Sequence, residues 1–130
     1  MDRSTLTVAQ QLAQVVSAFE ERLTGHAPRS VTVVLSEDTL VITLHGALSP
    51  AEKAVASSPA GAAQVQEFHR QLFNNSLDSL RQDISRITGV EVRGATAEVE
   101  TTTGFVMQVF LLAGSVPADS WSGSGPGKQL

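Results

Sequence analysis

The chain of 130 residues has no cysteine, no tyrosine and few aromatic residues of any kind. Without cysteine, neither a disulfide nor a thiolate metal site can form. Aromatic residues make up 5% of the chain, too few for the stacking platforms of proteins that bind single-stranded nucleic acid. The 9 Lys and Arg residues are scattered and the net charge is −4, whereas nucleic-acid binding needs a basic face. We therefore expect no nucleic-acid partner.

Long hydrophobic runs are also missing. The longest, residues 105–113, has the length of a strand and falls far short of the ~20 residues that span a bilayer. The first residues contain no continuous apolar segment of the kind a secretory signal needs, and no polybasic run marks a membrane-binding surface. We expect a soluble, cytoplasmic protein that does not insert into a membrane, with one globular domain.

Periodic patterns in the first half predict a helix, a hairpin and a second helix. Apolar residues recur at three- and four-residue steps over residues 5–24, and Gly25 follows as a C-terminal cap. Residues 31–35 and 40–44 are apolar and β-branched, with a polar turn between them, which predicts a β-hairpin. Ser49 and Pro50 then predict the start of a short helix that ends near residue 56.

The second half predicts a long helix followed by two strands. Residues 57–61 contain Ser, Pro and Gly and are expected to end the short helix. A long helix follows and ends at Gly89. Phe68 belongs to its predicted apolar stripe. Residues 90–99 and 105–113 predict two further strands, and the apolar phase of the first slips at Gly94, which indicates a β-bulge.

These elements predict an α+β two-layer sandwich of order α-β-β-α-β-β. Its four-stranded sheet is largely antiparallel, and two main helices cover one face. Residues 1–113 form the predicted domain, and the Gly-, Ser- and Pro-rich residues 114–130 form a flexible tail.

The last predicted strand is apolar on both faces, which is unusual when one face meets water. We expect its outward row to be an interface that forms a homodimer. Two alternatives are a tail that covers the patch through Val116 or Trp121, and a ligand groove. The candidate interface residues are Val106, Phe110, Leu112 and Val41.

No set of residues predicts catalysis, a metal site or a cofactor. His26, His45 and His69 lack the spacing of a helical zinc motif. Glu98 and Glu100 share one side of a strand, where a solvated surface is a better interpretation than an acid–base pair. We therefore expect the protein not to be an enzyme.

A weak candidate for an anion site combines Arg70, His69 and the helix start at Ser49. The competing interpretation is that Arg70 forms an ordinary surface ion pair with a nearby carboxylate from Glu67, Glu52 or Asp78. We favour the surface pair because such pairs are common.

Five segments together resemble the MpsC-like family, a group of small bacterial domains of formerly unknown function. The turn at residues 25–28 is similar to the family's Gly-Arg-Gly-Pro turn, and Leu-Ser-Pro-Ala-Glu at 48–52 is similar to its Leu-Thr-Pro-Ala-Glu block. Arg70, residues 87–92 and residues 109–112 match in order and spacing, so that the likeness covers residues 8–113. His26 and Ala27 replace the family's Arg-Gly, which removes any anion contact made by that arginine.

The resemblance implies a soluble accessory component of a bacterial membrane system that moves sodium or bicarbonate and generates a membrane potential. A membrane transport protein is then an expected partner. The leading hypothesis is a dimeric, non-enzymatic interaction or regulatory module, and the alternative is a small-anion sensor.

Overall fold

The computed structural model describes residues 6–117 and confirms the predicted α+β fold. Its elements are α1 (Val8–Thr24), β1 (Ser30–Ser36), β2 (Thr39–His45), α2 (Pro50–Val55), α3 (Pro59–Thr88), β3 (Val92–Glu100) and β4 (Phe105–Leu112). The strands form one sheet of order β1-β2-β4-β3, and every neighbouring pair is antiparallel. The last strand, β4, therefore lies between β2 and β3 and joins the two hairpins.

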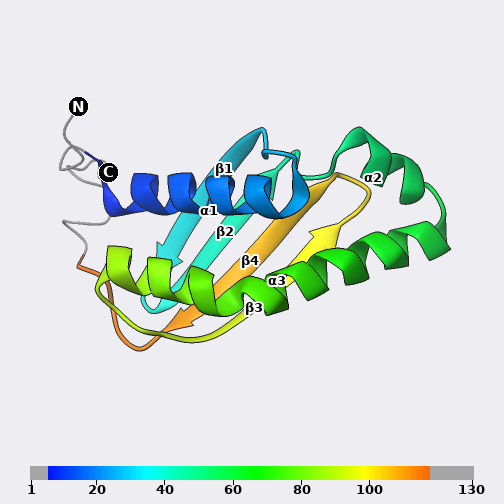
Figure 1. The fold of residues 1–130 in the computed structure, drawn as a ribbon. Coiled ribbons are helices and arrows are strands. Elements are labelled where there is room, and N and C mark those ends of the chain that lie inside the picture. Colours follow the sequence, from blue (N-terminus) through cyan, green and yellow to red (C-terminus); the bar gives the residue numbers. More distant parts are fainter. Residues whose placement is uncertain (1–5, 118–130) are drawn as a thin grey trace.

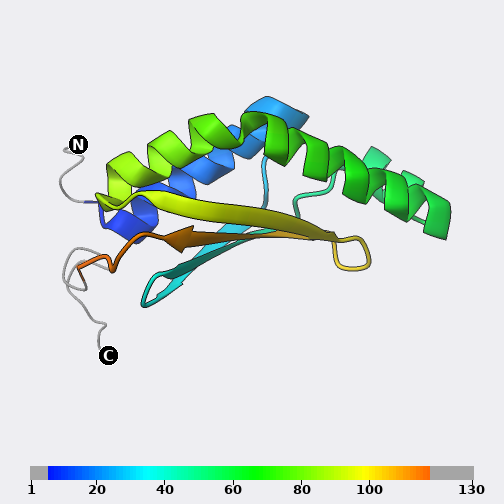
Figure 2. The same ribbon diagram turned by 90° about the horizontal axis from the view of Figure 1, so that it is seen from below.

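Both long helices cover the same face of the sheet. Figure 1 shows α1 and α3 crossing over the strands, and Figure 2 shows that no helix of the described residues covers the opposite face. The core lies between these layers. Its fully buried side chains include Leu12 and Val16 of α1, Leu80 and Ile84 of α3, and Leu40, Ile42 and Leu44 of β2.

Local capping sets the helix ends. The Thr7 side chain accepts a hydrogen bond from the Gln10 N–H, and the Gln10 side chain accepts one from the Thr7 N–H. This capping box starts α1 at Val8, later than the predicted residue 5. Gly25 and Gly89 end α1 and α3 with φ near +77° and +75°, as the sequence predicted, because only glycine adopts this region without strain.

The predicted break at residues 57–61 is present but shorter, because α2 ends at Val55 and α3 already begins at Pro59. Ser58 caps α3 by accepting a hydrogen bond from the Gly61 N–H, and Pro59 occupies the first helical turn, as Ser49 and Pro50 do in α2. Gly61 then lets α3 approach α2 closely, because a Cβ there would lie 1.7 Å from the Val55 carbonyl oxygen. The Ser-Pro pair thus begins a helix immediately after the previous one ends.

The sheet contains the predicted bulge, but the inner and outer faces of β4 are the reverse of those predicted. The register of β3 against β4 shifts between Val92 and Gly94, as expected from the slipped apolar phase. In β4, however, the predicted outward row of Val106, Phe110 and Leu112 is buried beneath the helices. The residues that alternate with them face away, because successive strand residues point to opposite faces.

Two smaller corrections concern the ends of the core. Phe68 was assigned to the buried stripe of the long helix but is half exposed. Together with Val55 of α2 and Gln64, it lines a surface groove between α2 and α3. Val116 is buried with the core residues, so packing continues past the predicted domain boundary at residue 113. Trp121 lies outside the described residues.

Candidate functional site

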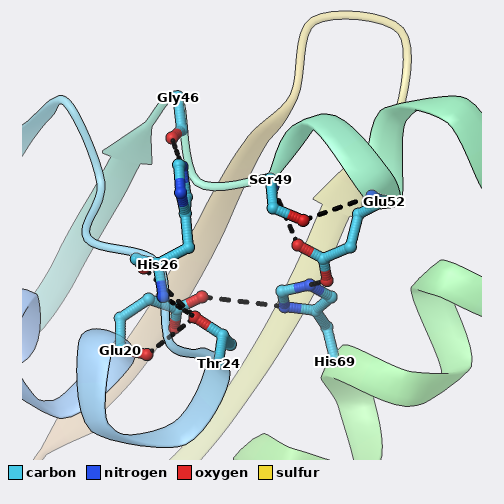
Figure 3. Close-up of polar contacts among 7 residues, drawn as sticks. All are labelled: Glu20, Thr24, His26, Gly46, Ser49, Glu52 and His69. Atoms are coloured by element: carbon cyan, nitrogen blue, oxygen red, sulfur yellow. Dashed lines mark hydrogen bonds and ion pairs between the residues drawn. The ribbon is translucent and has the colours of Figure 1, made fainter.

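Three helices each contribute one ionisable side chain to a buried cluster. Glu20 follows Phe19 on the buried side of α1, His69 lies on α3 between buried Val65 and Phe73, and Glu52 is at the start of α2. Figure 3 shows the His69 ring between the two carboxylates. Only 5% of Glu20 and 6% of His69 are exposed, whereas Glu52 is half buried at the margin of the cluster.

The contacts to His69 are unequal. Its Nε2 lies 2.7 Å from Glu52 Oε2, within hydrogen-bonding distance, whereas its Nδ1 lies 3.7 Å from Glu20 Oε2. The other oxygen of Glu52 accepts a hydrogen bond from the Ser49 N–H at 2.9 Å. The capping box of α2 therefore fixes the Glu52 carboxylate, which in turn orients the imidazole ring (Figure 3).

The two carboxylates are shifted in opposite directions. Burial raises the pKa of Glu20 above its ordinary 4.5, and the opposing attraction of His69 does not cancel this effect. Burial also acts to raise the pKa of Glu52, but hydrogen bonds from the Ser49 N–H and from His69 outweigh it, and the pKa falls below 4.5. Glu20 is therefore the carboxylate that retains a proton to higher pH.

A small enclosed cavity lies beside this cluster, between α1, α3 and the sheet. Its volume is about 20 Å³, close to the space that one water molecule needs, and its lining includes Glu20, His69 and Gln108. Glu20 Oε2 and Gln108 Oε1 are buried acceptors without a hydrogen-bond partner among the described residues. The arrangement can hold a proton or a small hydrogen-bond donor, and its enclosure excludes a substrate of ordinary size.

The structure separates the residues of the candidate anion site. His69 and Ser49 meet through Glu52, but Arg70 points elsewhere and binds Glu67, with Glu98 at 3.9 Å. The favoured interpretation of Arg70 as a surface ion pair agrees with this contact. An anion near His69 would face two carboxylates, so the arrangement argues against the proposed anion site. No group of three or more metal-ligating His, Cys, Asp or Glu side chains occurs within residues 6–117.

Sequence reasoning missed Glu20 and Gln108 as members of a common site. Each is a polar residue that the structure buries among apolar neighbours. Glu20 directly follows Phe19 in the stripe of α1, and Gln108 interrupts the buried row of β4. The polar break in an apolar row was the signal available, but only the fold shows that these two residues line one cavity.

The outer face of the sheet is the second candidate site, and here the predicted interface needs correction. Val106, Phe110 and Leu112 belong to the core, so only Val41 of the predicted interface lies on this face. The exposed apolar residues are Val34 (52%), Met107 (38%) and Leu111 (48%). Half-buried Val41 and Val109 connect them, since Val34 pairs with Val41, and Val41 pairs with Val109. We call these five residues the outer patch.

Acidic side chains border the outer patch. Glu98 lies opposite Met107 and Glu100 lies opposite Phe105 in the register of β3 with β4, so both residues share the outer face of the sheet at the β3 edge, where the Glu98 carboxylate also lies 3.9 Å from Arg70 of α3. Glu37 and Asp38 are exposed in the turn between β1 and β2. No Lys or Arg lies on the outer face of β1, β2 or β4. The patch is therefore apolar at its centre and negative at its border.

None of the helices within residues 6–117 has the length and apolar character required to cross a membrane.

Comparison with known proteins places the chain in a family. The chain is 25% identical over 112 residues to the uncharacterized protein YbcI of Bacillus subtilis (strain 168). This alignment covers 86% of this chain and 90% of that protein. No solved structure matches the chain. The family model described as "Na+-translocating membrane potential-generating system (MpsC)" matches residues 4–114, and the protein therefore belongs to the MpsC family.

Proposed function

We propose that the protein is a non-enzymatic, cytoplasmic accessory module of a bacterial membrane system that moves ions. It docks through the outer patch onto a membrane protein, at a segment with an apolar centre and flanking Lys or Arg residues. The observation that carries this proposal is the exposed apolar patch with its acidic border. The family description, which names a Na+-translocating system, supports a membrane partner.

Charge determines the kind of partner that fits. Glu98 and Glu100 flank the patch on one side, and the net charge of the chain is −4. Two outer patches placed face to face would bring these acidic borders together, which opposes self-association by this surface. An anionic lipid surface is disfavoured for the same reason. Cytoplasmic loops of membrane proteins carry an excess of Lys and Arg, so they complement an acidic border.

The buried cluster supports a role without catalysis. A reactive group must meet its substrate, and Glu20 and His69 lie beneath α1 and α3 in a cavity of about 20 Å³. Their contacts join α1, α2 and α3 to one another. The cluster thus fixes the helices in place, while the outer patch remains open for binding.

Site-specific photo-crosslinking in the native bacterial host tests the docking surface. A photoreactive phenylalanine analogue replaces Leu111 in one variant and Val55 in another, because both residues are 48% exposed but lie on β4 and α2 respectively. We expect the variant at Leu111 to form an adduct with an integral membrane protein in the membrane fraction, and the variant at Val55 to form none. Equal adducts at both positions, or none at Leu111, would overturn the proposal.

A variant that introduces a positive charge gives a second measurement on the same surface. Leu111→Lys places a cation in the outer patch, whereas Val55→Lys makes the same change on α2. We expect a synthetic peptide with an apolar centre and Lys at both ends to bind the native protein and the Val55 variant equally, and the Leu111 variant at least tenfold more weakly. A peptide with the same apolar centre but Glu at both ends is the control for charge, and we expect it to bind weakly.

A further inference from the structure

Two buried oxygen atoms beside the cavity between α1, α3 and the sheet lack a hydrogen-bond donor. Glu20 Oε2 and Gln108 Oε1 have no partner among the described residues, although only 5% of Glu20 and 3% of Gln108 are exposed. Both residues line the same cavity. Buried polar groups in native proteins are nearly always satisfied, because an acceptor that loses its hydrogen bonds to water without replacement destabilises the fold. The two oxygens therefore require a donor.

The neighbouring side chains do not supply this donor. His69 Nδ1 lies 3.7 Å from Glu20 Oε2, which is too far for a hydrogen bond, and its Nε2 contacts Glu52 at 2.7 Å. Arg70 also lines the cavity, but its guanidinium binds Glu67 on the surface of α3. Apart from these residues and the two acceptors, the lining is apolar. The donor that fits is a separate small molecule.

The charge of the cluster indicates that this donor is a cation. Glu20 and Glu52 are two carboxylates, and His69 between them supplies at most one positive charge. No Lys or Arg within residues 6–117 forms an ion pair with either carboxylate. The three groups in their ionised forms therefore retain a negative charge, and a buried charge such as that of Glu20 needs a partner. A cation balances this charge, whereas a water molecule does not.

The size and the walls of the cavity define the cation further. A volume of about 20 Å³ holds one group as large as a water molecule. Ca²⁺ takes about six to eight oxygen ligands, but only two unpaired side-chain oxygens are buried among the described residues. The rings of Phe19 and Phe73 form part of the lining, and aromatic rings attract ammonium groups. A cation that itself donates hydrogen bonds fits this lining better than a metal ion.

We propose that the cavity binds one ammonium ion, which donates hydrogen bonds to Glu20 Oε2 and Gln108 Oε1. The positive charge of the ion pairs with the Glu20 carboxylate. Methylated amines are larger than the cavity, so the site selects the unsubstituted ion. This inference does not depend on the proposed function, because it concerns the inner side of the sheet and a different ligand.

A proton competes with the ion for Glu20, because burial raises the pKa of that carboxyl. The ionisable groups around it are His69 on α3, Glu52 on α2 and His26 in the turn after α1. The two histidines act to lower the pKa of Glu20, and Glu52 acts to raise it. The ammonium ion keeps its charge between pH 6 and pH 8, whereas Glu20 loses its proton as the pH rises. We therefore expect binding to strengthen with pH over this range.

Nuclear magnetic resonance of isotope-labelled ammonium chloride tests the site directly. With the full chain, a bound ion should give a proton resonance separate from that of free ammonium and a nuclear Overhauser effect to the Phe73 ring. Ammonium chloride should also raise the midpoint of thermal unfolding above the value in equal concentrations of sodium chloride or tetramethylammonium chloride. Equal midpoints in the three salts, or no bound resonance at 100 mM ammonium, would overturn the proposal and leave water as the occupant.

Variants of the two acceptors test the assignment. Glu20→Gln removes the charge and Gln108→Leu removes the second acceptor, so each should weaken ammonium binding at least tenfold. Both variants should fold in ammonium-free buffer, because each replaces a buried unsatisfied group with an uncharged side chain of similar size. Glu21→Gln makes the same change at the next, exposed position of α1 and should bind like the native protein. A bound resonance that is unchanged in Glu20→Gln would contradict the site.

Discussion

The two faces of β4 are almost equally apolar but have opposite surroundings. One face carries Val106, Gln108, Phe110 and Leu112, all buried under the helices. The other carries Phe105, Met107, Val109 and Leu111, which are half buried or exposed. The more polar row is thus the inner one, since it includes Gln108. The comparison teaches that the hydrophobicity of a strand does not decide which of its faces enters the core.

The neighbouring strand decides it instead. Phe110 pairs with Leu40 and Val106 pairs with Leu44, so these β4 residues share the face of the fully buried row of β2. On the other face, Met107 pairs with Thr43. Residues that lie directly opposite in a sheet point to the same side, so the alternation in β2 fixes the orientation of β4.

The largest expected effect comes from truncating adjacent residues on the two faces. Phe110→Ala should lower the free energy of unfolding by about 3–5 kcal/mol, because it leaves a cavity in the core where Phe110 contacts the Phe73 ring. Leu111→Ala should lower it by less than about 1 kcal/mol, because Leu111 is half exposed. Urea denaturation followed by circular dichroism measures both values. Similar losses for the two variants would show that the outer face is covered in solution.

Much of the fold follows from local signals in the sequence. The caps at Gly25, Ser49 and Gly89 and the bulge at Gly94 require particular residues or phases, and the structure contains all four. The orientation of β4 could not be predicted in this way, because both of its rows are apolar. It depends on the pairing of β2 with β4, which are separated along the chain by α2, α3 and β3.

The second prediction uses the two carboxylates beside the inner face. The pKa of Glu20 is raised on folding, so the stability that its proton provides is present below its unfolded value and is lost as the pH rises through the folded value. Glu20→Gln keeps the neutral form at every pH. It should be more stable than the native protein by about 1–2 kcal/mol at pH 7, because a buried, unsatisfied carboxylate oxygen is removed. The difference should vanish toward pH 4.

Glu52→Gln is the matched control with the opposite slope. The pKa of Glu52 is lowered on folding, so its contribution is present above the unfolded value and is lost as the pH falls through the folded value. This variant should be less stable than the native protein at pH 7 and approach it in acid. Unfolding midpoints in urea between pH 4 and pH 8 measure both slopes. Two slopes of the same sign would contradict the opposed pKa shifts.

The candidate site was less predictable than the fold. His69 and Ser49 were proposed together from the sequence, and the structure does connect them, but through Glu52 and not through an anion. Arg70 follows His69 by one residue, which turns it about 100° around the helix and toward Glu67. Neighbours in a helical sequence therefore point to different surroundings. Contacts between α1 and α3, such as that of Glu20 with His69, are tertiary and leave no local pattern.

The third prediction concerns the polar residue of the inner face. Gln108→Leu should raise the free energy of unfolding by up to about 1 kcal/mol, because it replaces a buried acceptor that has no hydrogen-bond partner in the described residues with an apolar side chain of similar size. Gln108→Glu should lower it, because a second buried carboxylate would then lie in the cavity with Glu20. Destabilisation by the leucine would mean that Gln108 has a polar partner in solution.

The smallest expected effect comes from the outer face itself. Met107→Thr should change the free energy of unfolding by no more than about 0.5 kcal/mol, because Met107 is partly exposed. Its neighbour on β2 is already Thr43, and threonine is a residue that strands favour. Val106→Thr, the adjacent change on the inner face, should lower it by about 1–3 kcal/mol by burying a hydroxyl among apolar groups. If Met107→Thr leaves stability intact but weakens binding of the Lys-flanked peptide, the methionine is present for recognition and not for folding. A loss of stability that matches that of Val106→Thr would place Met107 in an interface that is already occupied.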